Sequence, residues 1–171
     1  MTFEYHFGIR PDYYVLVNLR GFKTIVDSLG GIDVNVIQTL HDERDDYPEH
    51  SDAYPDGFTV HPGLVHMDGA TALWYARSRK TTSDLDRIRR SQDVIIAIGK
   101  KLLSLDAINH IPELYLAYRQ TVDTDLALDD LLRTVPLIIK VNPNQVERYP
   151  ITIDQVIPWV DPVSKAQYLL P

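Results

Sequence analysis

Residues 72–92 read ALWYARSRKTTSDLDRIRRSQ and place a basic cluster beside the start of a helix. The window from 77 to 101 holds 8 of the 17 Lys and Arg residues but only three acids, so its charge is +5. The whole chain of 171 residues carries −7, which leaves −12 for the remainder. A basic island in an acidic chain is typical of a local anion site rather than of a surface for polyanions.

A helix begins inside this stretch. Ser83 followed three residues later by Asp86 is typical of a capping box, so we predict a helix from Asp84 to about Leu105. Counted at 100° per residue from Asp84, its apolar residues fall between about −80° and +40°. They predict one buried face, made of Ile88, Val94, Ile95, Ile98, Leu102 and Leu105.

Charged side chains share this predicted face. Asp84 and Arg87 lie inside the apolar sector, as does Ser91, whereas Arg89 and Asp86 point away from it. Because charged side chains are rarely buried alone, we expect Asp84 and Arg87 either to pair or to point together into a cleft where a ligand completes the set. The N-terminus of the helix adds N–H donors, which suit phosphate.

Several of these charges also have a structural explanation. Asp84 and Asp86 are favourable in a first helical turn because they complement its dipole. Arg89, Lys100 and Lys101 fit a solvated helix face.

Arg77 and Arg79 differ from the other basic residues. They leave an apolar helical segment at 70–76 only two residues apart and just ahead of the Asp84 turn. Planar guanidinium groups bind anions with paired N–H donors, so we expect Arg77, Arg79 and Arg87 to converge on one anion site.

These residues also carry a resemblance. The run HMDGATALWYARSR at 66–79, followed by DLDRIRRSQ at 84–92, resembles the signature of the LytR-CpsA-Psr family of cell-wall enzymes. Upstream, DYYVLVNLRGFKTIVDSLGGIDVNV at 12–36 is similar to the strand, helix and Gly-Gly turn of that family. The resemblance is strongest over residues 12–103 and implies a single, partial domain over 1–171.

The resemblance implies a function. Family members are Mg²⁺-dependent phosphotransferases that move a glycopolymer from a polyprenyl-pyrophosphate carrier to a peptidoglycan acceptor, outside the cytoplasmic membrane. Here it implies Mg²⁺ as cofactor and a location at the outer face of that membrane or outside the cell. It also implies pyrophosphate-binding residues, with Asp84 orienting the arginines and no catalytic residue assigned: Arg77, Arg79, Asp84, Arg87, Arg90, Ser91 and Gln92.

The chain departs from the family pattern in two ways. Ser91-Gln92 stands where the family usually has Gln-Gln, which shortens one expected amide contact or replaces it by water. Family members also begin earlier, with a membrane anchor and then a strand and loop bearing metal-binding aspartates, whereas Met1 here falls just ahead of the strand at Tyr13. We therefore expect the metal ligands and any membrane attachment upstream, which leaves a binding remnant without turnover as the alternative function.

Composition favours one α/β domain. The chain is 44% hydrophobic and 24% charged, with no Cys. Together with the resemblance, this predicts a layered α-β-α sandwich with a mixed central sheet, lacking its N-terminal strands. No run reaches the roughly 18 apolar residues needed to span a bilayer. A nucleic-acid-binding regulator is a distant alternative, because the net charge is negative and no recognition-helix pattern is present.

The other elements follow from local patterns. We predict a buried strand at 13–17 inside the sheet, because its run is apolar on both faces. A helix with apolar residues over 22–29 stops at Gly30-Gly31, and strands follow at 32–36 and 58–60.

The remaining segments are less regular. The acids of 41–56 are interpreted as a solvated loop, with a Ca²⁺ or Mg²⁺ site as the alternative. Helices are predicted at 108–118 and 126–141, the second interrupted by Pro136, and they are expected to pack with the 84–105 helix. In the family, comparable helices wall a pocket for the polyprenyl tail, and a plain core is the alternative. The C-terminal residues 146–171 suit an edge strand and an extended segment.

Overall fold

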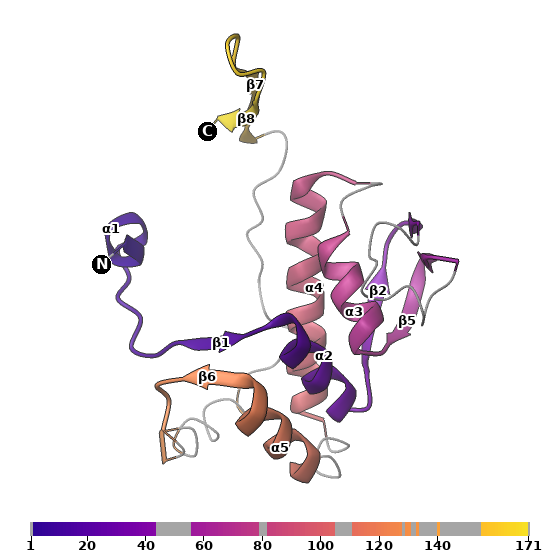
Figure 1. The fold of residues 1–171 in the computed structure, drawn as a ribbon, viewed down its shortest axis with the longest axis vertical. Helices are drawn as coiled ribbons and strands as arrows, with labels where there is room; N and C mark the ends of the chain where they lie inside the picture. The colour runs from indigo at the N-terminus through magenta and orange to yellow at the C-terminus, as the bar shows by residue number, and fades with distance from the viewer. Residues whose placement is uncertain are drawn as a thin grey trace.

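The computed structural model describes residues 2–43, 56–78, 82–104, 111–127, 129–130, 133, 140 and 155–170. The described residues form both helices and short strands, so the predicted α/β class is confirmed (Figure 1). The described strands form four antiparallel pairs: β1 (Val15–Val17) with β6 (Val122–Thr124), β2 (Ile32–Val36) with β5 (Gly63–Met67), β3 (Leu40–Asp42) with β4 (Phe58–Val60), and β7 (Ile157–Val160) with β8 (Gln167–Leu170).

Five helices accompany these strands within the described ranges: α1 (Thr2–Phe7), α2 (Leu19–Ser28), α3 (Gly69–Arg77), α4 (Asp84–Leu102) and α5 (Ile111–Thr121). The predicted helix at 22–29 is confirmed as α2, and the Gly30-Gly31 stop is confirmed by positive φ angles of 72° and 84°. The helices predicted from Asp84 and over 108–118 are confirmed as α4 and α5, with shifted ends. No local pattern predicted α1.

The core forms between the β2–β5 pair and the helices. Ile32, Val34 and Val36 alternate with exposed residues along β2, as the period-two pattern predicts, and their side chains are buried. Helix α4 packs against β2 and α3 packs against β5. Trp74 of α3 and Val94 of α4 join the same apolar cluster, so the two helices that flank the basic stretch are anchored by the core.

Helix α2 fixes the position of α3 by a close backbone approach. A Cβ atom placed on Gly69 would lie 2.3 Å from the carbonyl oxygen of Lys23, so only glycine fits there. At this contact the Gly69 N–H donates to Asp27 Oδ1 at 2.7 Å. Helix α2 also packs against α5, where a Cβ atom placed on Gly21 would lie 2.6 Å from the Cβ atom of Thr121.

The strand predicted inside the sheet is exposed instead. Strand β1 pairs only with β6 among the described strands, and Val15 and Leu16 are each 61% exposed. The prediction from the apolar run is therefore wrong within this structure, because burial requires neighbours on both faces and not only apolar side chains. Strands β1 and β2, on either side of α2, lie in different pairs, so the described residues do not assemble the mixed central sheet.

The buried face of α4 is also rotated from the predicted one. Arg90, Val94 and Ala97 are the buried residues of this helix, whereas Ile88, Ile95 and Leu102 are 46%, 66% and 42% exposed. The physical reason is that α3 and β2 pack against the side of α4 that carries Arg90, Val94 and Ala97, and Ile88 and Ile95 lie outside this contact.

Two further expectations are corrected. Residues 41 and 42 belong to β3, not to a solvated loop, and the carboxylate of Asp42 is 1% exposed and accepts a hydrogen bond from the Trp74 indole at 2.7 Å. Helix α5 packs mainly on α2 rather than on α4. The acids at 44–55 and most of the helix predicted at 126–141 lie outside the described residues.

Candidate functional site at the start of helix α4

The candidate site lies where α3 ends and α4 begins. Arg77 is half-buried in the last turn of α3, and Asp84 and Arg87 occupy the first turn of α4. The predicted capping box is confirmed: Ser83 Oγ accepts from the Asp86 N–H at 3.2 Å, and the Ser83 N–H donates to Asp86 Oδ2 at 3.4 Å. Because this cap sets the first turn, it also sets the direction of the side chains that follow.

Arg87 and Asp84 form the pair that their spacing predicts. The Nε atom of Arg87 lies 3.5 Å from Asp84 Oδ1, and the two side chains are 40% and 52% exposed. An exposed ion pair contributes only about 0–1 kcal/mol to folding. The fold therefore depends little on this pair. The Nε atom of Arg87 is buried, while the rest of the side chain is partly accessible from solvent.

Arg90 has the opposite environment. Its side chain is fully buried and donates to the carbonyl oxygens of Tyr75 and Ser78, the latter at 2.5 Å, and to Thr82 Oγ1 at 2.8 Å. The guanidinium carbon also lies 5.6 Å from the centre of the Tyr75 ring. Burial lowers the pKa of Arg90 and raises the pKa of Tyr75, because both charged forms lose solvation.

These contacts make Arg90 the residue that fastens the end of α3 to α4. It satisfies two carbonyl groups at the C-terminus of α3, which no helical N–H reaches. The contact of Arg90 with pyrophosphate, which the resemblance implies, stays a prediction.

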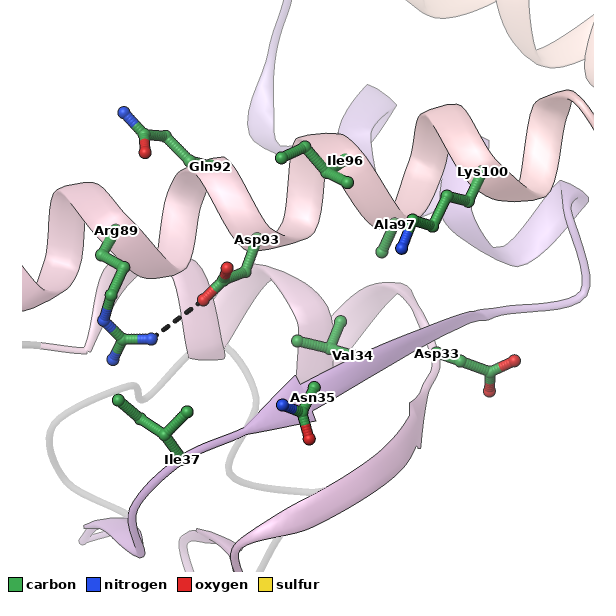
Figure 2. Close-up of a pocket in the computed structure, with 10 residues that line it drawn as sticks. All are labelled: Asp33, Val34, Asn35, Ile37, Arg89, Gln92, Asp93, Ile96, Ala97 and Lys100. Atoms are coloured by element: carbon green, nitrogen blue, oxygen red, sulfur yellow. Dashed lines mark hydrogen bonds and ion pairs between the residues drawn. The ribbon is translucent and has the colours of Figure 1, made fainter. Parts of the chain in front are cut away.

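Ser91 and Gln92 face different surroundings. The Ser91 hydroxyl lies 3.0 Å from the Arg87 carbonyl oxygen and 3.2 Å from that of Ala76, so it ties α4 to α3. Gln92 lines a pocket of about 380 Å³ between α4 and β2, and its Oε1 atom is buried without a hydrogen-bond partner. Figure 2 shows Gln92 on α4 together with the residues of β2 across the pocket. The contact of Ser91 and Gln92 with pyrophosphate, which the resemblance implies, stays a prediction.

Arg79 lies outside the described residues, so the convergence of the three arginines stays a prediction. For Arg89 the structure differs from the expected solvated face. Its side chain is 23% exposed, donates to Asp93 Oδ2 at 3.0 Å and lies 3.9 Å from Asp86 Oδ1 (Figure 2). The acids three residues before and four residues after Arg89 were the sequence signal for these pairs.

A second feature of the site has no counterpart in the sequence prediction. The β7–β8 hairpin lies beyond the N-terminal end of α4 (Figure 1). Residues of both elements line a pocket of about 440 Å³. Trp159 and Tyr168 line it from the hairpin, and Asp84 lines it from α4. Two aromatic residues in a tail that otherwise suits an extended segment were the available signal.

The described part of the chain contains no group of three or more His, Asp or Glu side chains arranged to hold a metal ion. At the junction, the carboxylate of Asp84 is already paired with Arg87. The residues at the junction of α3 and α4 do not by themselves fit a Mg²⁺ site, because the ion needs several oxygen ligands around it. None of the helices in the described ranges is both long and apolar enough to cross a membrane.

Known proteins are similar to this chain in sequence and in fold. TagU from Enterococcus faecalis, described as a polyisoprenyl-teichoic acid–peptidoglycan teichoic acid transferase, is 32% identical over 132 residues, which are 76% of this chain and 39% of TagU. The crystal structure of TagV from B. subtilis superposes with a TM-score of 0.77 at 24% identity and covers 99% of this chain and 61% of that one. A structure of TagT bound to LIIa-WTA gives a TM-score of 0.60 at 28% identity, over 82% of this chain and 50% of that one.

The chain thus spans about two fifths of the length of the curated relative that it matches. Its likeness to TagV shows the fold, and the sequence profile of the LytR_cpsA_psr family matches residues 1–168. Because that profile covers nearly the whole chain, the chain belongs to the LytR-CpsA-Psr family.

Proposed function

We propose that this chain supplies the pyrophosphate-binding part of an enzyme that transfers a glycopolymer from a polyprenyl-pyrophosphate carrier to peptidoglycan in cell-wall biogenesis. The observation that carries the proposal is the accessible Asp84–Arg87 pair in the first turn of α4, beside Arg77 at the end of α3. Two relatives support the substrate class, since TagU is described as a teichoic acid transferase and TagT has been solved bound to LIIa-WTA.

The chemistry of this junction suits a diphosphate. The guanidinium group of Arg87 offers planar N–H donors that match two phosphate oxygens, and the first N–H groups of α4 add partial positive charge. In this role Asp84 holds Arg87 by its Nε atom, at 3.5 Å, and directs the group. The Arg77 side chain, half-buried at the end of α3, lies on the same junction.

Binding and transfer are separate in this proposal. Phosphoryl transfer draws much of its rate from a metal ion and from donors around the developing charge, and losing one such donor costs about 10²–10³ in rate. The family expectation is Mg²⁺, whose ligands do not gather among the described residues. We therefore propose that residues 1–171 bind a prenyl diphosphate with negligible transfer or hydrolysis, and that the whole protein acts at the outer face of the cytoplasmic membrane.

The test is titration calorimetry with geranyl diphosphate. We expect Arg87→Ala to weaken binding about tenfold to a hundredfold, because a hydrogen bond to a charged group contributes about 1.5–3 kcal/mol. Arg133→Ala is the matched control, since Arg133 also pairs with an acid nearby in the sequence, Asp129 at 3.8 Å, and is 77% exposed. Equal affinity of Arg87→Ala and the parent chain would refute the anion site.

A phosphate-release assay in Mg²⁺ tests the second half of the proposal. We expect no release above the rate of the uncatalysed reaction. Robust, Mg²⁺-dependent release by residues 1–171 would show that the metal ligands lie within the chain, and the acids at 44–55 would then be replaced first.

A further inference from the structure

The pocket between α4 and the β7–β8 hairpin adjoins the proposed pyrophosphate site through Asp84. Its volume of about 440 Å³ lies within the range of ligand pockets, roughly 300–1,000 Å³. Ser83 and Asp84 contribute polar groups from α4, and Gln167 contributes an amide from β8. Trp159 and Tyr168 supply an aromatic wall opposite the helix.

The two aromatic rings form a pair on the hairpin. Trp159 and Tyr168 are opposite residues in the β7–β8 register, and their ring centroids lie 5.7 Å apart at an interplanar angle of 40°. They remain 44% and 48% exposed, whereas Trp74 in the core is 1% exposed. Large aromatic side chains that line a pocket and stay half exposed are available for contact with a ligand.

A bonded turn holds this hairpin in shape. Asp161 accepts hydrogen bonds at 2.8 Å from the Val163 N–H and from the Ser164 hydroxyl, and these bonds hold the pKa of Asp161 below its ordinary value. The Lys165 N–H donates to the Asp161 carbonyl oxygen at 2.9 Å. The turn therefore fixes the strand positions from which Trp159 and Tyr168 project.

We propose that this pocket binds the sugar residue attached to the diphosphate, with Trp159 and Tyr168 stacked on the sugar ring. The inference rests on the proposed function, because Arg87 and Asp84 would hold the diphosphate next to it. A sugar has one face of C–H groups, which suits the electron-rich face of an aromatic ring, and a rim of hydroxyls. Those hydroxyls meet Ser83, Asp84 and Gln167 at the polar edge of the pocket.

A prenyl tail fits this pocket less well. Its hydrocarbon would displace water from the Asp84 carboxylate and the Gln167 amide without offering hydrogen bonds in return. Covering polar groups without partners costs free energy, and a sugar avoids that cost. Leu85, Pro158 and Val160 complete the lining beside the two aromatic residues, so the pocket combines an apolar wall with a polar edge. A glycosyl group, with a C–H face and a rim of hydroxyls, matches both parts of the lining.

The experiment compares geranyl diphosphate with geranyl-diphosphoryl-N-acetylglucosamine. The chain has only two tryptophans and Trp74 is buried, so a ligand-induced change in tryptophan fluorescence reports Trp159. We expect the sugar-bearing probe to bind about fivefold tighter, as aromatic stacking contributes about 0.5–1.5 kcal/mol. Affinities of the variants are measured by calorimetry, with circular dichroism as the check on folding.

The variants separate this inference from the proposed function. Trp159→Ala is expected to lose the fivefold preference and to bind geranyl diphosphate unchanged, while Trp159→Phe keeps most of the preference. Val163→Ala is the control, because Val163 is 89% exposed in the same hairpin and does not line the pocket.

Two results would overturn the inference. One is a Trp159→Ala chain that keeps the full preference for the sugar-bearing probe, and the other is a loss of affinity for both probes alike, which would assign the pocket to the prenyl tail. The proposed function fails separately, when Arg87→Ala binds geranyl diphosphate as tightly as the parent chain does.

Discussion

Arg87 and Arg90 lie three residues apart on α4 and have opposite surroundings. Arg87 is 40% exposed and pairs with one carboxylate, whereas Arg90 is fully buried against carbonyl groups of α3. The motif DRIRR indicates that both are basic but not which one the fold buries. That difference depends on where the end of α3 lies, which is a property of the tertiary structure.

We expect Arg90→Ala to reduce the free energy of unfolding by about 3 kcal/mol, because each buried carbonyl group left without a donor costs about 1–3 kcal/mol. Arg87→Ala is expected to cost less than about 1 kcal/mol. Urea unfolding followed by circular dichroism measures both. Equal losses in the two variants would contradict the assignment of Arg90 to the fold and of Arg87 to the ligand.

At the scale of elements, the start of α4 and the end of α2 were predicted correctly from the sequence, whereas the buried face of α4 was not. Ser83 and Asp86 mark the start of α4 because a capping box is a local pattern of one turn. The buried face of α4 depends on its neighbours, and Ile95 is 66% exposed although it follows the buried Val94. We predicted no strand at β5, because Pro62-Gly63 is typical of a turn. The strand forms there because it pairs with β2 along its whole length.

The contact between α2 and α3 gives a prediction at this scale. We expect Gly69→Ala to lower the free energy of unfolding by about 2 kcal/mol, because the added methyl group meets backbone atoms of Lys23. Gly99→Ala in α4 is the matched control, since nothing lies within 4 Å of its added Cβ and alanine favours a helix by about 1 kcal/mol.

Thermal unfolding of both glycine variants provides the measurement, with a lower Tm expected for Gly69→Ala and an unchanged or higher Tm for Gly99→Ala. An unchanged Tm for Gly69→Ala would show that α2 and α3 are not in close backbone contact.

For the whole molecule, the distribution of charge bears on the class of ligand. The chain carries −7 overall, with the positive charge concentrated in the window 77–101. Two basic residues of that window, Arg89 and Arg90, are held in contacts within the fold. Fewer arginines therefore face solvent than the sequence count suggests, which fits one small anion rather than a nucleic-acid backbone.

We expect no binding of duplex DNA tighter than about 10⁻⁴ M at physiological salt, since affinity for DNA follows the number of phosphates that basic side chains neutralise. Fluorescence anisotropy with a labelled duplex at several salt concentrations measures this. Micromolar affinity with a steep dependence on salt would instead favour a nucleic-acid-binding function.

The sequence by itself determined the local features of this protein: the capping box of α4, the alternation of β2, the Gly30-Gly31 stop and the Asp84–Arg87 pair. Each depends on residues within one or two turns, and their short-range interactions are written in the residue order. The tertiary structure alone decided which face of α4 is buried, that Arg90 fastens α3, and that the β7–β8 hairpin meets the start of α4. These features join residues far apart in the chain, and burial and pairing depend on partners that no local pattern identifies.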